Sequence, residues 1–283
     1  MIARISNCLV LTLVPWICNR YLDQRGSFAK RLRLQTFGFC NNSFPNMRFE
    51  SSSLLSIVFF PKTGSRKLRF SIIVSLFFLL LLGLLDVFGA DLKVIDSFFH
   101  THRWELGNQW FFKLLYDWGP YPSLILGLSS LFAGVYLLVR TKSCRKCIPF
   151  VYPFLTLVVG PGLLVNAIFK DHWGRPRPRQ LELYGEDQSY SRFWQPNFGN
   201  GSKSFPSGHA SVGFHLCCLA FLHKNPFRKT CLTLGLLWGS LMGLARILQG
   251  GHYVTDVVAS GGLVLLTCIL LCPEETLRKL PKS

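Results

Sequence analysis

Three short polar segments, far apart in the sequence, carry basic side chains and histidines at spacings that suit phosphate chemistry. The first, KDHWGRPRPRQ, begins at Lys170 and alternates arginine with proline. Pro176 and Pro178 exclude a regular helix and favour an extended backbone between them. Guanidinium groups held on such a backbone suit phosphate oxygens, which they bind through two parallel hydrogen bonds. The candidate phosphate ligands here are Lys170 and Arg177, with Arg175 and Arg179 as accessory ligands.

The second segment, SFPSGHAS, reads as the beginning of a helix. Helix N-termini bind anions because their first backbone N–H groups have no partner within the helix. Gly208 would let an oxyanion approach closely, and Ser207 could either cap the helix or donate its hydroxyl to a phosphate. His209 adds a group that can transfer protons.

The third segment, ARILQGGHYVTD, pairs a histidine with an acid. If the helix that follows has begun by His252, then Asp256, four residues later, shares its face and can orient its imidazole by a hydrogen bond. A carboxylate near the end of an apolar helix is costly unless it is paired, which favours a functional pair. Arg246 stands shortly before and supplies a further cation.

The composition predicts that these segments belong to a membrane protein, whose helices would position them. The chain has 283 residues, of which 49% are hydrophobic and only 16% are charged, whereas about a quarter of the residues of a soluble domain are charged. A net charge of +17 would suggest nucleic-acid binding in a soluble protein. Here the basic residues gather beside apolar stretches, as they do at the cytoplasmic ends of membrane spans. We therefore expect a bilayer environment and no nucleic-acid partner.

The fold class that we expect is an all-α bundle of six transmembrane helices. A span needs about 20 mostly apolar residues, and six windows approach that length. The windows are Phe70–Phe88, Tyr121–Val139, Ile148–Phe169, Ser207–Leu222, Cys231–Leu248 and Val254–Cys272. The segment between the first two, Gly89–Pro120, mixes aromatic and acidic residues and is expected to lie at the membrane interface.

The domain boundaries follow from these windows. Residues 1–69 form a basic amino-terminal extension that we expect to be poorly ordered, residues 70–272 the membrane domain, and residues 273–283 a cytoplasmic tail. Clusters of Lys and Arg before the first window and after the second, fourth and sixth all fall on one side, which predicts cytoplasmic termini. The three polar segments then meet on the opposite, non-cytoplasmic side of a plasma or inner membrane.

The three segments together resemble the signature of the phosphatidic acid phosphatase type 2 and vanadium haloperoxidase superfamily, in its integral-membrane lipid phosphatase branch. Its pattern is Lys, six residues, Arg-Pro; then Pro-Ser-Gly-His; then Ser-Arg, five residues, His, three residues, Asp. This sequence matches each part, except that Ala245 stands where the family has Ser. The matching residues are Lys170, Arg177 and Pro178; Pro206, Ser207, Gly208 and His209; and Arg246, His252 and Asp256.

The resemblance implies a mechanism without a metal or another cofactor. His252, oriented by Asp256, would attack phosphorus and form a phosphohistidine, while His209 protonates the leaving oxygen and then activates water. The oxygens of the transferred group would be held by positive charges and hydrogen-bond donors. These phosphate ligands would be Lys170, Arg177, Ser207, Gly208 and Arg246.

The function expected from the resemblance is hydrolysis of a lipid phosphate monoester or diphosphate at the outer membrane face. Candidate substrates are lipid A, phosphatidylglycerol phosphate, phosphatidic acid and prenyl diphosphates, and the GRPRPR stretch favours lipid A. Two alternatives remain open. The same site could pass its phosphate to another lipid instead of water, or the protein could be a non-catalytic phospholipid transporter or binding protein.

Overall fold

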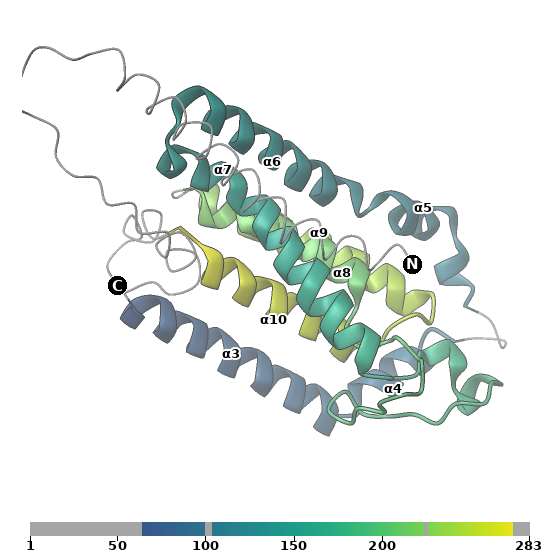
Figure 1. The fold of residues 1–283 in the computed structure, drawn as a ribbon. Coiled ribbons are helices and arrows are strands. Elements are labelled where there is room, and N and C mark those ends of the chain that lie inside the picture. Colours follow the sequence, from purple (N-terminus) through teal and green to yellow (C-terminus); the bar gives the residue numbers. More distant parts are fainter. Residues whose placement is uncertain (1–63, 100–103, 224–225, 274–283) are drawn as a thin grey trace, which may run out of the picture. The chain divides into compact units, whose positions relative to one another are not determined.

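The computed structural model describes residues 64–99, 104–223 and 226–273, and every regular element in these ranges is a helix. Figure 1 shows their course through the chain. The longer helices are α3 (Gly64–Val87), α6 (Tyr121–Thr141), α7 (Cys144–Leu157) with its π-helical continuation η2 (Val158–Lys170), α9 (Phe227–Leu248) and α10 (Val254–Leu271). The shorter ones are α4 (Ala90–Asp96), η1 (Leu106–Asn108), α5 (Trp110–Trp118), η3 (Pro178–Gln180), η4 (Glu182–Tyr184), α8 (Gly208–Phe214) and η5 (His215–Phe221).

Five helical stretches in the described residues are long and apolar enough to cross a membrane, and the chain is an integral membrane protein. They are Lys67–Val87, Trp110–Thr141, Lys146–Lys170, Phe227–Leu248 and Val254–Leu271. The predicted count of six is therefore not confirmed. The fourth predicted span corresponds to the shorter apolar helix Gly208–Phe221. Its α-helical and 3₁₀ halves together rise about 25 Å, less than the roughly 30 Å of a hydrocarbon core.

Two further boundaries differ from those predicted. Helix α3 begins at Gly64, inside the predicted extension. Helix α5 belongs to the same apolar stretch as α6, so the last part of the expected interfacial segment continues directly into a span. The remainder of the predicted extension, up to residue 63, and the predicted tail after residue 273 lie outside the described residues.

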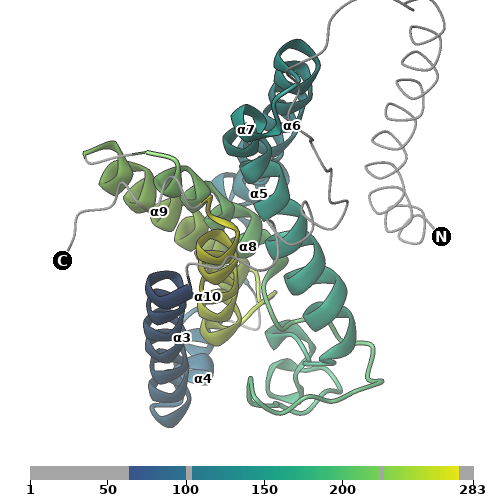
Figure 2. The ribbon, with the colours of Figure 1, turned by 60° about the vertical axis from the view of Figure 1, so that its left-hand side comes forward.

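Helix α10 lies at the centre of the described bundle. It packs against α3, α8 and η2, and 61% of its apolar window is buried, against 11% for the window in α3. Figures 1 and 2 both show α3 beside α10 and α6 beside α7. The leucine-rich α3 leaves most of its apolar side chains exposed, as expected of a helix that faces lipid.

Small residues let the helices around α10 approach closely. A Cβ atom added to Gly213 of α8 would lie 2.8 Å from the Cα atom of Gly239 in α9, so a larger residue would push these helices apart. In η2, Pro161 lacks a backbone N–H and stands within a π-helical stretch, where the Asn166 amide donates to its carbonyl at 2.7 Å. This widened helix ends at Lys170 and determines where that side chain enters the site.

Candidate active site

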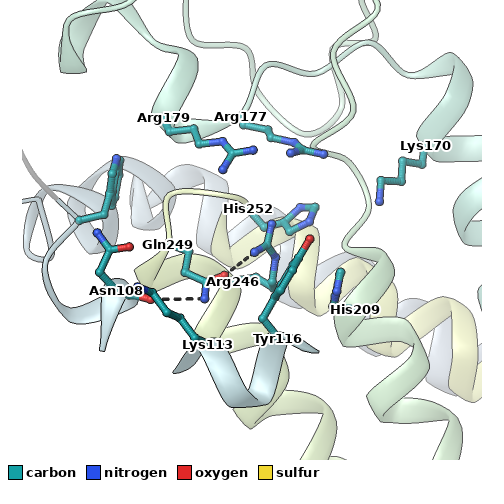
Figure 3. A pocket seen from close by; sticks show the side chains of 12 residues that line it. Asn108, Lys113, Tyr116, Lys170, Arg177, Arg179, His209, Arg246, Gln249 and His252 are labelled. Carbon is teal, nitrogen blue, oxygen red and sulfur yellow. Dashed lines mark hydrogen bonds between the residues drawn. The ribbon is translucent and has the colours of Figure 1, made fainter. Parts of the chain in front are cut away.

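A cleft of about 510 Å³ lies where η2, α5, α8 and the turn between α9 and α10 meet. Figure 3 shows the side chains that surround it. It contains basic side chains and two histidines, whereas carboxylates are absent from its lining in the described part of the chain. The lining residues are Trp104, Gly107, Asn108, Lys113, Tyr116, Lys170, Arg177, Arg179, His209, Arg246, Gln249 and His252.

The structure brings together one histidine from each of two motifs. His209 is the second residue of α8, and its ring stacks on Tyr116 of α5 with centroids 4.5 Å apart. His252 lies in the turn before α10, which begins only at Val254. The two are therefore presented by separate elements. The last helix begins at Val254, where the predicted window Val254–Cys272 begins, so the condition that it has begun by His252 is not met.

The Nδ1 atom of His252 contacts two acceptors that fix the orientation of the ring. That atom lies 2.7 Å from the backbone carbonyl of Ser204 and 3.5 Å from Oδ2 of Asp256. A carbonyl can only accept a hydrogen bond, so Nδ1 carries the proton and Nε2 keeps a free electron pair. Burial lowers the pKa of His252 to about 4, although the neighbouring Asp256 acts in the opposite direction. At neutral pH the imidazole is therefore uncharged, the form that a nucleophile requires.

Asp256 is fixed by several donors beside His252. Its carboxylate accepts hydrogen bonds from the guanidinium of Arg175 at 2.6 Å, the hydroxyl of Ser204 at 2.6 Å and the backbone N–H of Tyr253 at 2.9 Å. The last bond caps the first turn of α10, because Asp256 is its third residue. The acid thus ties the helix start, the loop before α8 and the histidine into one unit.

Arg175, expected as an accessory phosphate ligand, does not line the cleft. Its side chain is fully buried, bonds to Asp91 of α4 at 2.8 Å as well as to Asp256, and packs over the ring of Tyr253. Asp91 in turn accepts hydrogen bonds from the backbone N–H and the hydroxyl of Thr255. Two buried carboxylates pair with this guanidinium, so Arg175 contacts Asp256 behind His252 and not the cleft itself.

The other cations of the motifs do line the cleft. Arg177 has the extended backbone predicted for it, and the backbone N–H of Arg179 donates to the Gly250 carbonyl at 3.0 Å. This bond holds the arginine loop over the turn that carries His252. Arg246 lies over the ring of Tyr116 and donates to the side chain of Gln249.

Ser207 and Gly208 lie beside the cleft without lining it. Ser207 is fully buried, and its hydroxyl accepts a 3.5 Å hydrogen bond from the Ala210 N–H as the N-cap of α8. A Cβ at Gly208 would lie 3.0 Å from Nζ of Lys170 and 2.7 Å from the Asn166 side-chain oxygen. Glycine therefore leaves the room that the Lys170 ammonium occupies.

Several residues that line the cleft are not among those predicted from the three motifs. The α5 residues Lys113 and Tyr116 stand three positions apart, which puts them on one helix face. They fell within a segment that was expected to lie flat on the membrane. Gln249 stands inside the third motif without an expected role, and Ala245, the departure from the family pattern, is buried away from the cleft lining.

A family model described as the PAP2 superfamily matches residues 150–276, the part of the chain that contains all three motifs. These residues are therefore similar to the PAP2 superfamily. Helix α5, which supplies Lys113 and Tyr116 to the cleft, lies before the matched residues.

Several curated proteins that match part of this chain are named lipid A phosphatases. A lipid A 4'-phosphatase of Francisella tularensis subsp. novicida is 40% identical over 131 residues, covering 44% of this chain and 55% of that protein. A Rhizobium leguminosarum lipid A 4'-phosphatase is 35% identical, over 42% and 53% of the two chains. A Rhizobium etli lipid A 1-phosphatase is 33% identical, over 49% and 59%. The chain thus spans about half the length of the curated relatives it matches.

Among solved structures, the chain resembles a transmembrane PAP2 type phosphatidylglycerolphosphate phosphatase from Bacillus subtilis. The TM-score is 0.44 at 19% sequence identity, and the match covers 75% of this chain and 98% of that one.

Proposed function

We propose that this protein is a membrane-embedded lipid phosphatase that removes a phosphate group from a lipid A-type headgroup. The observation that carries the proposal is the state of His252, whose Nδ1 donates to a carbonyl and whose side chain lines a cleft rich in cations. A neutral imidazole facing bound phosphate is a nucleophile suited to phosphorus. The relatives named as lipid A phosphatases support the choice of lipid.

The first chemical step forms a phosphohistidine. Nε2 of His252 bonds to phosphorus as the bond between phosphorus and the lipid oxygen breaks, and His209 gives that oxygen its proton. In the second step His209 takes a proton from water, whose oxygen attacks phosphorus and breaks the bond to Nε2. Inorganic phosphate leaves, and both histidines return to their starting states.

Positive side chains stabilise the transferred group in both steps. Lys170, Arg177 and Arg246 line the same cleft as the two histidines and would neutralise the oxygens whose charge develops as the bond breaks. Because these three side chains supply the positive charge, no step of the scheme requires a metal ion. Asp256 stabilises the imidazolium character that His252 acquires when it carries phosphorus.

The site is proposed to open at the non-cytoplasmic face, with both termini in the cytoplasm. Basic residues at Lys142, Lys146 and Lys229 stand at the ends of spans opposite the cleft, where the positive-inside rule expects them. Single cysteines at Lys93 and Lys142, introduced into a cysteine-free chain that keeps its activity, test this in intact cells. We expect a membrane-impermeant maleimide to label position 93 and not position 142, and the reverse pattern would overturn the orientation.

The catalytic proposal is tested by phosphate release from purified protein in detergent. The panel contains lipid A, phosphatidic acid, phosphatidylglycerol phosphate and a prenyl diphosphate. We expect release from lipid A, lost in His252→Ala and His209→Ala proteins that insert and melt like wild type. Transfer of phosphate to an added lipid with no free phosphate would indicate a phosphotransferase, and a blank panel with retained lipid binding would indicate a binding or transport protein.

A further inference from the structure

The cleft is larger than the phosphate group that His252 would attack. Its volume of about 510 Å³ falls in the range of about 300–1,000 Å³ that encloses whole drug-sized ligands. Figure 3 shows Lys170 and His209 at one end, with Asn108, Lys113 and Arg179 toward the other end, beyond Arg246. The lining beyond Arg246 therefore has room for headgroup atoms that take no part in the reaction.

The charge of the cleft exceeds what one phosphate neutralises. Five Lys and Arg side chains line it, and no Asp or Glu does so among the described residues. A phosphate monoester carries about −1.5 to −2 at pH 7, which leaves about three positive charges without a counterion. Lys113 and Arg179 have no carboxylate partner within the described ranges. The surplus cations therefore stand at the end away from Lys170.

One glutamine, Gln249, connects the end of the cleft that contains Lys113 to Arg246. The side-chain amide of Gln249 donates to the carbonyls of Gly107 at 3.3 Å and Phe112 at 3.2 Å. Its oxygen accepts from Arg246. The η1–α5 segment, which carries Asn108 and Lys113, is thus bonded to the helix that carries Arg246. Two anions of one ligand could meet both ends without any rearrangement of the backbone.

The lining of the cleft also contains an aromatic side chain, Trp104. Trp104 packs over the backbone at Gly250, where a Cβ would lie 2.5 Å from its Cε2 atom, and the left-handed φ of +60° favours glycine there. The indole also packs against Phe99 and Tyr184, which hold its plane. The indole and the exposed Asn108 line the same cleft, where an aromatic face and an amide could together contact a sugar ring.

We propose that Asn108, Lys113 and Arg179, with Trp104, form a second subsite that binds another phosphate on the sugar headgroup of the substrate. This inference rests on the proposed function and narrows its substrate class. The preferred substrate then carries the scissile phosphate in reach of His252 and a second phosphate, not attacked, at the far end. Contacts to that second phosphate raise affinity and set the register of the headgroup.

The test compares two synthetic substrates, an acylated disaccharide with two phosphates and the same lipid with one. For wild type we expect kcat/KM to be at least tenfold higher for the bisphosphate, as expected from charge-assisted hydrogen bonds. The Lys113→Ala/Arg179→Ala double variant should bring the ratio close to one, mainly through KM. Both side chains are exposed, so their removal should not unfold the protein. Lys93→Ala, an exposed lysine of α4 outside the cleft lining, is the matched control and should keep the ratio.

A second measurement separates this inference from the proposed reaction. Binding of both lipids to His252→Ala protein, measured without turnover, should show the same preference for two phosphates and the same loss in the double variant. Equal affinity for the two lipids, or a preference that survives the double variant, would overturn the subsite. Absence of turnover in wild type, with the binding preference intact, would overturn the phosphatase and leave the subsite standing.

Discussion

The Nδ1 atom of His252 lies 2.7 Å from the backbone carbonyl of Ser204, closer than its 3.5 Å approach to the Asp256 carboxylate. The carbonyl is the nearer acceptor and is sufficient to place the proton on Nδ1. Asp256 therefore acts mainly through its charge, while Ser204 determines the tautomer. This division of roles could not be expected from the His252–Asp256 spacing, because the Ser204 carbonyl lies 48 residues earlier in the chain.

The division predicts a moderate effect of Asp256→Asn. In serine-protease triads, replacing the acid by its amide also reverses the histidine tautomer, and kcat falls roughly 10⁴-fold. Here the Ser204 carbonyl would keep the productive tautomer, so we expect a fall of about 10²-fold from the loss of charge alone. Steady-state kcat on the best lipid of the panel checks this. A loss as large as that of His252→Ala would show that Asp256, and not Ser204, orients the ring.

Arg175 is predicted to stabilise the fold more than any surface ion pair. It is fully buried and neutralises both Asp91 and Asp256. Arg175→Met would leave two buried carboxylates without a cation, at a cost of about 3–5 kcal/mol. Thermal unfolding in detergent measures the change. The control is Arg192→Ala, which breaks the 3.2 Å pair of a half-exposed arginine with Asp86 and should cost about 0–1 kcal/mol. Equal losses for the two variants would contradict a supporting role for Arg175.

The double variant Arg175→Met/Asp91→Asn refines the same prediction. Asp91→Asn removes one of the two carboxylates that lose their cation. Part of the lost stability should therefore return, since only Asp256 then lacks a cationic partner. Activity should stay low, because the carboxylate beside His252 has still lost its 2.6 Å partner. Full recovery of kcat together with stability would mean that Arg175 does not position Asp256.

The sequence was sufficient to predict that the three motifs approach one another, but not which of their residues line the cleft or how each is used. Lys170, Arg177, His209, Arg246 and His252 line one cleft, as their matching spacings suggested. Arg175 stands two residues from Arg177, and nothing local separates their roles. The difference comes from Asp91, 84 positions away, whose helix α4 packs against α10. Such long-range pairing is not visible in local spacing.

Membrane spans were predicted from apolar length, and the predicted count of six is not confirmed at the segment where apolar length and burial diverge. The helix Gly208–Phe221 is apolar because it packs against α9 and α10, and most of its side chains are buried. Hydropathy does not distinguish an apolar helix buried in protein from one that faces lipid. Helix α5 differs in the other direction. Its aromatic residues are typical of a membrane interface, but the helix belongs to the candidate span that ends at Thr141.

The low pKa of His252 predicts a specific acid dependence. Burial lowers this pKa to about 4 from the usual value of about 6.5, so protonation favours the unfolded chain. The stabilisation from the neutral imidazole is complete above about pH 6.5 and is lost as the pH falls toward 4. Carbon-13 labelling of the histidine rings, with the His252 signal assigned from His252→Gln, should show a midpoint near 4. A midpoint near 6.5 would mean that the ring is solvated and not held as described.

Arg177→Lys tests whether the cleft needs a guanidinium or only a positive charge. An ammonium keeps the charge but cannot make two parallel hydrogen bonds to one phosphate, so kcat/KM should fall about 10²-fold. Arg192→Lys makes the same exchange at an exposed arginine outside the cleft lining and should change kcat/KM less than twofold. If Arg177→Lys behaved like this control, Arg177 would contribute only to the general field of the cleft, and phosphate positioning would fall to Lys170 and Arg246.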